Sequence, residues 1–141
     1  MTDTQTFEDI LIEDMRAHDG QVTTGPLAGH PLLVMRSRGA KSGAERRAIL
    51  TWHRDGGDYV VAGTAGGSPT TPAWVHNVDE HPEVRIETEN RTLKARATVI
   101  GEGPERDRLW DDHVARLPWF ADYPKQTGRV IPMVRITPVA A

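Results

Sequence analysis

The chain has 141 residues, of which 38% are apolar and 26% charged, enough for one domain with a hydrophobic core. It contains no cysteine, which excludes disulfides, thiolate catalysis and cysteine-based zinc sites. The formal net charge of −3 argues against a nucleic-acid partner, and no apolar run approaches the ~20 residues that a transmembrane helix needs.

The N-terminal region is acidic, with six carboxylates against Arg16 among the first 20 residues. It lacks the basic start and the apolar run of a signal peptide, so we expect a cytoplasmic protein. Residues at helical spacing predict an amphipathic helix over about residues 6–18. The residues that form its apolar face are Phe7, Ile10, Leu11 and Met15. We expect residues 1–28 to form this helix and a linker, and residues 29–141 to form the main domain.

Short apolar segments separated by glycine and proline turns predict an antiparallel sheet. Strands are expected over about residues 32–35, 47–52, 59–64, 84–86, 93–99 and 130–136. Two further helices are expected, one from Pro72 to His81 and one that carries Leu109 and Leu117 on its apolar side. Pro132 suggests that the last strand is an edge strand or is bulged. The pattern indicates an α+β fold, mainly antiparallel and plausibly a partly closed barrel.

Positive charge gathers in residues 36–54, where six basic residues stand against one acid, a local charge of +5. This region either binds an anion or is simply a solvated pair of strands.

Familiar catalytic motifs are missing. Gly39-Ala40-Lys41-Ser42 lacks the glycine and the helix of a P-loop, and Gly66-Gly67-Ser68 lacks the closing glycine of a nucleophile elbow. The six histidines are scattered, with no ligand cluster for a metal. A bound cofactor is therefore expected to supply the reactivity.

Several short motifs, in order, resemble the deazaflavin (coenzyme F-420)-dependent nitroreductase family over about residues 29–138. The motifs are Pro31-Leu32-Leu33-Val34, Gly39-x-Lys41-Ser42-Gly43-x-x-Arg46, Ala65-Gly66-Gly67-Ser68-Pro69, Pro72-Ala73-Trp74-x-x-Asn77, Asn77-x-x-x-x-Pro82-x-Val84 and Ala121-Asp122-Tyr123-x-x-x-Thr127. The resemblance implies a split β-barrel like that of FMN-binding and pyridoxamine-phosphate oxidase-like proteins. It also implies 8-hydroxy-5-deazaflavin, coenzyme F-420, as the cofactor.

The resemblance also implies roles for individual residues. The coenzyme has an anionic phospholactyl-oligoglutamate tail, which Lys41 and Arg46 would hold with Arg47 as a helper, because guanidinium groups bind such anions bidentately. Ser42 and the backbone N–H groups of its turn would add donors.

The deazaflavin ring would lie along small residues after the third strand and against the short helix that follows. Trp74 would be an apolar wall and Asn77 a hydrogen-bonding anchor. The cofactor-binding positions implied around the ring are Ala62, Thr64, Ala65, Gly66, Gly67, Ala73, Trp74 and Asn77.

The chain departs from the family pattern at several positions. Ala40 replaces a frequent arginine, and Ala65 replaces a lysine of the nitroreductase itself. Thr64 replaces a serine but keeps a hydroxyl, so it is a candidate donor to the substrate. The nitroreductase has an aromatic trio where this chain has Leu117, Phe120 and Tyr123. Tyr123 is the only phenol left, so the resemblance does not extend to nitroimidazole activation.

The leading hypothesis is an oxidoreductase that transfers hydride from the reduced deazaflavin to a quinone, enone or nitro compound. Thr64 and Tyr123 are the candidate catalytic hydroxyls, with solvent as the other source of the proton. Two alternatives remain open: an FMN-dependent reductase on the same barrel, and a non-catalytic carrier of the deazaflavin or of a lipid. No metal is expected, and the protein is expected to be a monomer or a homodimer.

Overall fold

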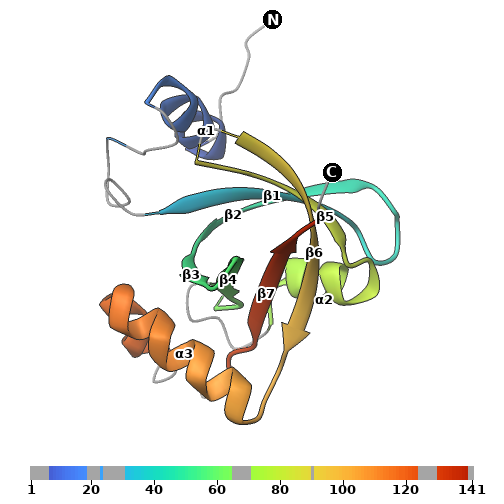
Figure 1. The fold of residues 1–141 in the computed structure, drawn as a ribbon. Coiled ribbons are helices and arrows are strands. Elements are labelled where there is room, and N and C mark those ends of the chain that lie inside the picture. The colour runs from blue at the N-terminus through green and yellow to red at the C-terminus, as the bar shows by residue number, and fades with distance from the viewer. Residues whose placement is uncertain are drawn as a thin grey trace, which may run out of the picture.

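The structure is a computed structural model that describes residues 7–18, 23, 31–64, 71–89, 91–123 and 130–139. In this part of the chain, seven strands form one antiparallel sheet in the order β2-β1-β5-β6-β7-β4-β3, with helices packed around it (Figure 1). The elements are α1 (Phe7–Ala17), β1 (Leu32–Arg38), β2 (Glu45–Thr51), β3 (His53–Asp55), β4 (Asp58–Ala62), α2 (Ala73–Glu80), β5 (Glu83–Thr88), β6 (Arg91–Ile100), α3 (Pro104–Arg116), the 3-10 helix η2 (Pro118–Asp122) and β7 (Met133–Pro138).

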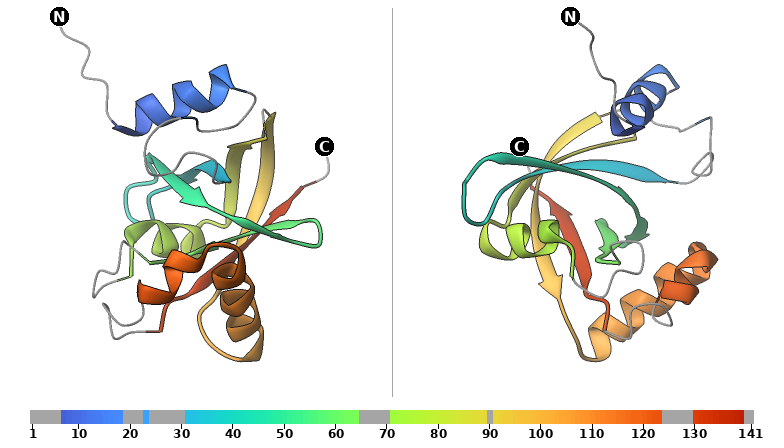
Figure 2. Two further views of the ribbon diagram at one scale, coloured as in Figure 1. Left: turned by 90° about the vertical axis from the view of Figure 1, so that its left-hand side faces the viewer. Right: turned by 180° about the vertical axis from the view of Figure 1, so that it is seen from behind.

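The sheet curls because one run of chain contributes to both of its edges. β2 pairs with β1, and β3 pairs with β4, yet only Trp52 separates β2 from β3. The chain therefore bends at Trp52 and passes from one edge of the sheet to the other, which produces the curved section seen in Figure 2. The expected antiparallel split barrel is confirmed.

Side chains that alternate along the strands divide the apolar residues between the barrel interior and two outer layers. Leu33 and Met35 of β1 face the interior, together with Ile86 of β5. On the outer face of β1, Leu32 and Val34 pack against Ile12 and Met15 of α1. On the outer face of β4 and β7, a third cluster joins the sheet to α3 and η2. Its buried residues are Val60, Ala62, Leu109, Leu117, Phe120, Ile131 and Met133.

Gly63 marks the point where β4 ends against both β7 and α2. Its N–H donates to the carbonyl oxygen of Pro132 at 2.9 Å. A Cβ at this position would lie 2.9 Å from Cγ2 of Val75 and 3.0 Å from Cγ of Pro132. Position 63 therefore has no room for a larger residue, because the side chains of Val75 and Pro132 fill the space beside it.

The expected helix over residues 6–18 is confirmed as α1, and most expected strands are present but longer. Of the two alternatives for Pro132, the edge position was wrong: β7 lies between β6 and β4 in the sheet, so it is not an edge strand. Pro132 precedes β7, where its missing N–H costs no ladder bond and its carbonyl accepts from Gly63.

No described helix has the length and apolar character to cross a bilayer.

Candidate functional site

The turn between β1 and β2 is held in shape by its own backbone. Gly39 N–H donates to Ala44 O at 2.7 Å, and Gly43 N–H donates to Gly39 O at 2.9 Å. Gly43 has φ of +70°, a left-handed conformation that glycine adopts without steric cost. The amides of Lys41 and Ser42 are not used in these bonds.

Asn77 of α2 fixes the position of this turn. Its side chain is buried, and Oδ1 accepts a hydrogen bond from Ala40 N–H at 3.0 Å. The sequence interpretation gave Asn77 a direct role toward the coenzyme. In the structure its oxygen ties the β1–β2 turn to the helix that carries Trp74, a contact between residues 37 positions apart, and its proposed role toward the coenzyme would fall to its amide nitrogen.

Ser42 connects the turn to Arg46. Ser42 Oγ accepts from Ala44 N–H at 3.2 Å and from Nη2 of Arg46 at 3.4 Å. A hydroxyl has two acceptor positions and one donor, so these contacts leave its proton to donate to an anion. Lys41 and Arg46 are both exposed, and neither forms a salt bridge with any described residue. They therefore present two uncompensated positive charges at one turn.

The strand register places Arg46 and Arg47 on opposite faces of the sheet. Arg46 lies opposite Ser37, which is buried and shares the face of Met35 in the barrel interior. Arg47 lies opposite Arg36, on the outer face. The structure therefore groups Arg46 with Lys41 and Ser42 and does not bring Arg47 to the same side.

Trp74 lies in the first turn of α2, where it is half-buried against the interior cluster of the barrel. The neighbouring Ala73 is exposed. Asn77 lies one turn further along the same helix and holds the β1–β2 turn. The ring of Trp74 and the cations of Lys41 and Arg46 are therefore both attached to α2.

The end of β4 brings the other expected residues toward η2. Ala62 is buried in the cluster that contains Phe120, and Tyr123 packs against the same cluster. The rings of Phe120 and Tyr123 meet edge to face with centroids 5.2 Å apart. Thr64, which follows β4, is half-buried. Ala65, Gly66, Gly67 and Thr127 lie outside the described residues.

Of the three positions compared with the aromatic trio, only Tyr123 remains partly exposed. Leu117 and Phe120 are buried, with 2% and 7% of their surfaces exposed. Their role is to pack η2 against the sheet, so the phenol of Tyr123 is the one polar group that this trio offers to a ligand.

The structure also contains a buried histidine pair that the sequence interpretation missed. Nδ1 of His53 lies 2.8 Å from Nδ1 of His113, and Phe120 packs edge to face on His113. Burial, followed by the charge of His53, lowers the pKa of His113 to about 3. Burial likewise lowers the pKa of His53. The contact between the two rings joins β3 to α3. His113 shares the helical spacing of Leu109 and Leu117, which is the sequence signal that could have indicated its burial.

The donors at the turn fit an anionic coenzyme. Lys41 supplies a point charge, Arg46 a planar guanidinium group and Ser42 a hydroxyl proton, which together suit phosphate or carboxylate oxygens. Trp74 suits a planar ring. No group of three or more histidine, aspartate or glutamate side chains in the described part of the chain is arranged to hold a metal.

Comparison with known proteins places the chain in a family. A model of the F-420H(2)-dependent quinone reductase family matches residues 10–138. An F-420H(2)-dependent quinone reductase of Mycobacterium tuberculosis is 30% identical over 139 residues, which cover 89% of this chain and 91% of that protein.

Solved structures agree with this assignment. An F-420-H2 dependent reductase (FDR-A) is 32% identical with a TM-score of 0.67, covering 75% of this chain and 93% of that one. A domain-swapped dimer is 28% identical with a TM-score of 0.69, covering 92% and 97%. A Listeria innocua protein described as a pyridoxamine 5′-phosphate oxidase is only 14% identical, covers 96% of this chain and 95% of that one, and shares the fold with a TM-score of 0.55. The chain belongs to the F-420H(2)-dependent quinone reductase family, oxidoreductases that use coenzyme F-420.

Proposed function

We propose that this protein transfers hydride from reduced coenzyme F-420 to a quinone. The observation that carries the proposal is the Asn77–Ala40 hydrogen bond, which joins the Lys41 and Arg46 cations to the helix that carries Trp74. A coenzyme with a planar ring and an anionic tail needs these two kinds of surface at a fixed separation. The family match supports the same coenzyme.

Lys41, Ser42 and Arg46 would hold the phosphate and carboxylates of the tail. Trp74 would lie against the ring. The small residues at and after the end of β4 would allow the ring to approach the backbone, as the resemblance implies. Those proposed residues are Ala62, Ala65, Gly66 and Gly67, with Ala73 beside Trp74. Arg47 remains a proposed helper, although its side chain lies on the other face of the sheet.

The reduced coenzyme supplies hydride when it is bound. The protein positions the acceptor over the ring and stabilises the negative charge that develops on the acceptor's oxygen. Thr64 is the proposed donor to that oxygen, and Tyr123 is the other hydroxyl at the same end of β4. Hydride transfer leaves the acceptor's oxygen negatively charged. The hydroxyl stabilises it by a hydrogen bond and passes its proton to it, and solvent then restores the proton on the hydroxyl.

Quinones are the proposed acceptor class because the Mycobacterium tuberculosis relative is an F-420H(2)-dependent quinone reductase. Enones and nitro compounds are proposed as secondary acceptors. We also propose that the protein acts in the cytoplasm, as a monomer or a homodimer. The domain-swapped dimer among the similar structures supports the dimer, and light scattering of the purified protein would distinguish the two states.

The proposal is tested by mixing the purified protein with reduced coenzyme F-420 and menadione and following coenzyme oxidation by absorbance. We expect enzyme-dependent oxidation with menadione, and slower oxidation with an enone or a nitro compound. Reduced FMN serves as the comparison coenzyme. Turnover with FMN and none with F-420 would contradict the proposal. Tight F-420 binding without turnover of any acceptor would indicate a carrier.

A further inference from the structure

Four basic side chains form a row across the outer face of the sheet. In the strand register, Arg36 of β1 lies directly opposite Arg47 of β2 on one side and Arg85 of β5 on the other. Arg85 in turn lies opposite Lys94 of β6. The cationic row, Arg47-Arg36-Arg85-Lys94, therefore crosses four neighbouring strands with no acid in the same register.

Such a row opposes folding, because like charges directly opposite each other in an antiparallel sheet destabilise it. Two of the acids nearest to the row are already engaged by other arginines, and a third, Glu45, lies opposite Arg38 and outside the row. Glu87 receives two hydrogen bonds from Arg16, at 2.8 and 2.9 Å, and Glu83 pairs with Arg96 at 3.7 Å. Among the described residues, no salt bridge neutralises the side chains of Arg36, Arg85 or Lys94.

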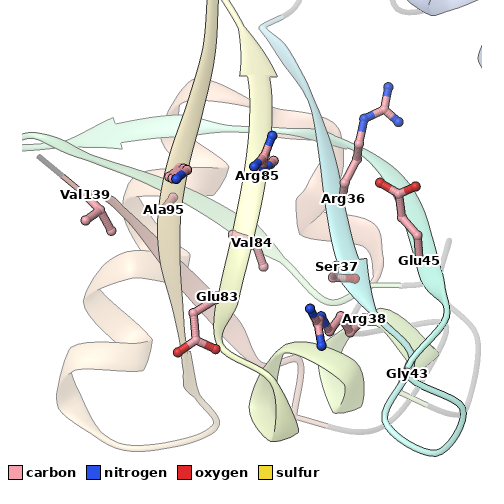
Figure 3. A pocket seen from close by; sticks show the side chains of 11 residues that line it. Arg36, Ser37, Arg38, Gly43, Glu45, Glu83, Val84, Arg85, Ala95 and Val139 are labelled. Atoms are coloured by element: carbon pink, nitrogen blue, oxygen red, sulfur yellow. The ribbon is translucent and has the colours of Figure 1, made fainter. Parts of the chain in front are cut away.

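Three members of the row, Arg36, Arg85 and Lys94, lie in a hollow and not on a flat surface. A groove of about 720 Å³ is lined by Arg36, Arg38, Arg85 and Lys94, with Gly43 of the β1–β2 turn at one end (Figure 3). A second hollow of about 290 Å³ continues past Arg36 and Arg85 toward α1. The groove is thus bounded by the basic turn at one end and by α1 at the other.

The row members that line this groove, Arg36, Arg85 and Lys94, are not among the proposed coenzyme contacts, whereas Arg47 is also the proposed helper of the turn. Side chains on one strand alternate between faces, so Arg36 and Arg38 point outward while Ser37, opposite Arg46, points inward. The coenzyme contacts of Arg46 and Trp74 belong to the interior side, and the cationic row belongs to the outer side.

We propose that this outer groove binds a short linear polyanion, a chain of carboxylate or phosphate groups. Adjacent strands lie about 4.8 Å apart, so the row offers positive charges at a regular spacing that a flexible anionic chain can follow. Glu45 and Glu83 also line the groove. These acids would repel a duplex nucleic acid or an anionic membrane spread over the whole face, and they leave only the line of cations for a narrow chain.

The anionic chain has two possible sources. It is either the acidic tail of the bound coenzyme, continued around the turn past Gly43, or a separate phosphate or carboxylate chain. The first source rests on the proposed function, whereas the second does not. Binding of a probe in the absence of coenzyme therefore tests the groove independently of the enzyme activity.

The test is calorimetric titration of coenzyme-free protein with inorganic tripolyphosphate and with a tetraglutamate peptide at low salt. Arg85→Gln should weaken the binding of both probes on the order of fivefold, the scale expected for one exposed charge contact. Lys94→Gln should act in the same direction. Arg108→Gln is the matched control, because Arg108 is an exposed arginine of α3 that does not line the groove, and it should leave probe affinity unchanged.

Stability gives a second readout that does not require a ligand. Because Arg85 faces like charges on both sides, Arg85→Gln should raise the melting temperature at low salt by about 2–4 °C. Tripolyphosphate should stabilise the parent protein more than this variant. Arg96→Gln should not raise the melting temperature, because it removes an attractive pair with Glu83.

Coenzyme titration then separates the two sources. Weaker coenzyme binding by Arg85→Gln would identify the coenzyme tail as the occupant, and unchanged coenzyme binding with weaker probe binding would identify a separate anion. Either result supports the groove. The inference is overturned if the parent protein binds neither probe or if Arg85→Gln binds them as the parent does. It is also overturned if Lys41→Ala abolishes probe binding, because the probes would then bind the β1–β2 turn and not the groove. Binding to anionic vesicles but to neither probe would overturn it as well.

Discussion

Oδ1 of Asn77 accepts a hydrogen bond from Ala40 N–H at 3.0 Å, which joins α2 to the β1–β2 turn. Without this contact, the turn would still close through the bonds of Gly39 and Gly43. It would lose its fixed distance from Trp74. The bond therefore positions the coenzyme site although it does not have to touch the coenzyme.

The first prediction follows from this contact. Asn77→Ala should weaken coenzyme binding roughly two- to tenfold, since a net hydrogen bond contributes about 0.5–1.5 kcal/mol. Asp79→Ala, at an exposed position of the same helix, is the control and should bind coenzyme normally. A lower melting temperature of Asn77→Ala with unchanged coenzyme affinity would show that the turn's position does not matter for binding.

The second prediction separates the two faces of the β1–β2 hairpin. Lys41→Ala and Arg46→Ala should each reduce coenzyme affinity about ten- to a hundredfold, because each removes a charge-assisted contact. Arg47→Ala should have a smaller effect, because its side chain lies on the outer face. Fluorescence titration at about 0.01 M and 1 M salt would show weaker binding at high salt if exposed cations hold the tail. Equal affinities for all three variants and the parent would argue against this role of the turn.

The third prediction concerns the proton donor. Thr64→Val keeps the shape of the side chain and removes its hydroxyl, so kcat with menadione should fall roughly ten- to a thousandfold while coenzyme affinity stays constant. Tyr123→Phe is the matched comparison. Loss of rate only in Tyr123→Phe would transfer the role to the phenol, and loss in neither would leave solvent as the proton source.

The buried histidine pair predicts acid sensitivity. The pKa of His113 is lowered to about 3 in the folded protein, and the pKa of His53 is also lowered. In the unfolded chain both would titrate near 6.5. Their full contribution to stability is therefore present above about pH 6.5. As the pH falls from 6.5 toward 3, the free energy of unfolding decreases by about 1.4 kcal/mol per pH unit for each ring that stays neutral in the folded protein.

Urea unfolding between about pH 7.5 and 4.5 measures this dependence, because this range spans the pKa of about 6.5 of a free histidine. His113→Gln should be less stable at neutral pH and should show a shallower loss of stability on acidification. His76→Gln, at an exposed position of α2, should keep the slope of the parent protein. Identical slopes for the parent and His113→Gln would show that the pair does not control the acid response. The charged groups around His53 that also act on its pKa are Arg116, Asp112, Asp55 and Arg108.

Local sequence patterns were sufficient to predict the hairpin turns and the helices. Glycine at positions 39 and 43 marks the β1–β2 turn, and apolar residues at helical spacing mark α1. The short strand β3 was missed because three residues carry no measurable period. Its existence depends on pairing with β4 across the Gly56-Gly57 turn.

Long-range relationships could not be obtained from the sequence. The Asn77 contact spans 37 residues, and the cationic row requires the register of four strands, which no local pattern encodes. His113 was overlooked because its neighbours Asp112 and Arg116 are polar. Its burial follows only when α3 packs on the sheet.

The most direct test of the central claim is a single-turnover measurement. Enzyme loaded with one equivalent of reduced coenzyme F-420, carrying either hydrogen or deuterium at C5, is mixed rapidly with menadione under exclusion of oxygen. We predict that the enzyme accelerates oxidation of the coenzyme and that this oxidation is slower for the deuterated form. Arg96→Gln should show the same isotope effect as the parent protein. Coenzyme that stays bound and reduced in the presence of menadione would contradict the claim that this chain is a deazaflavin-dependent quinone reductase.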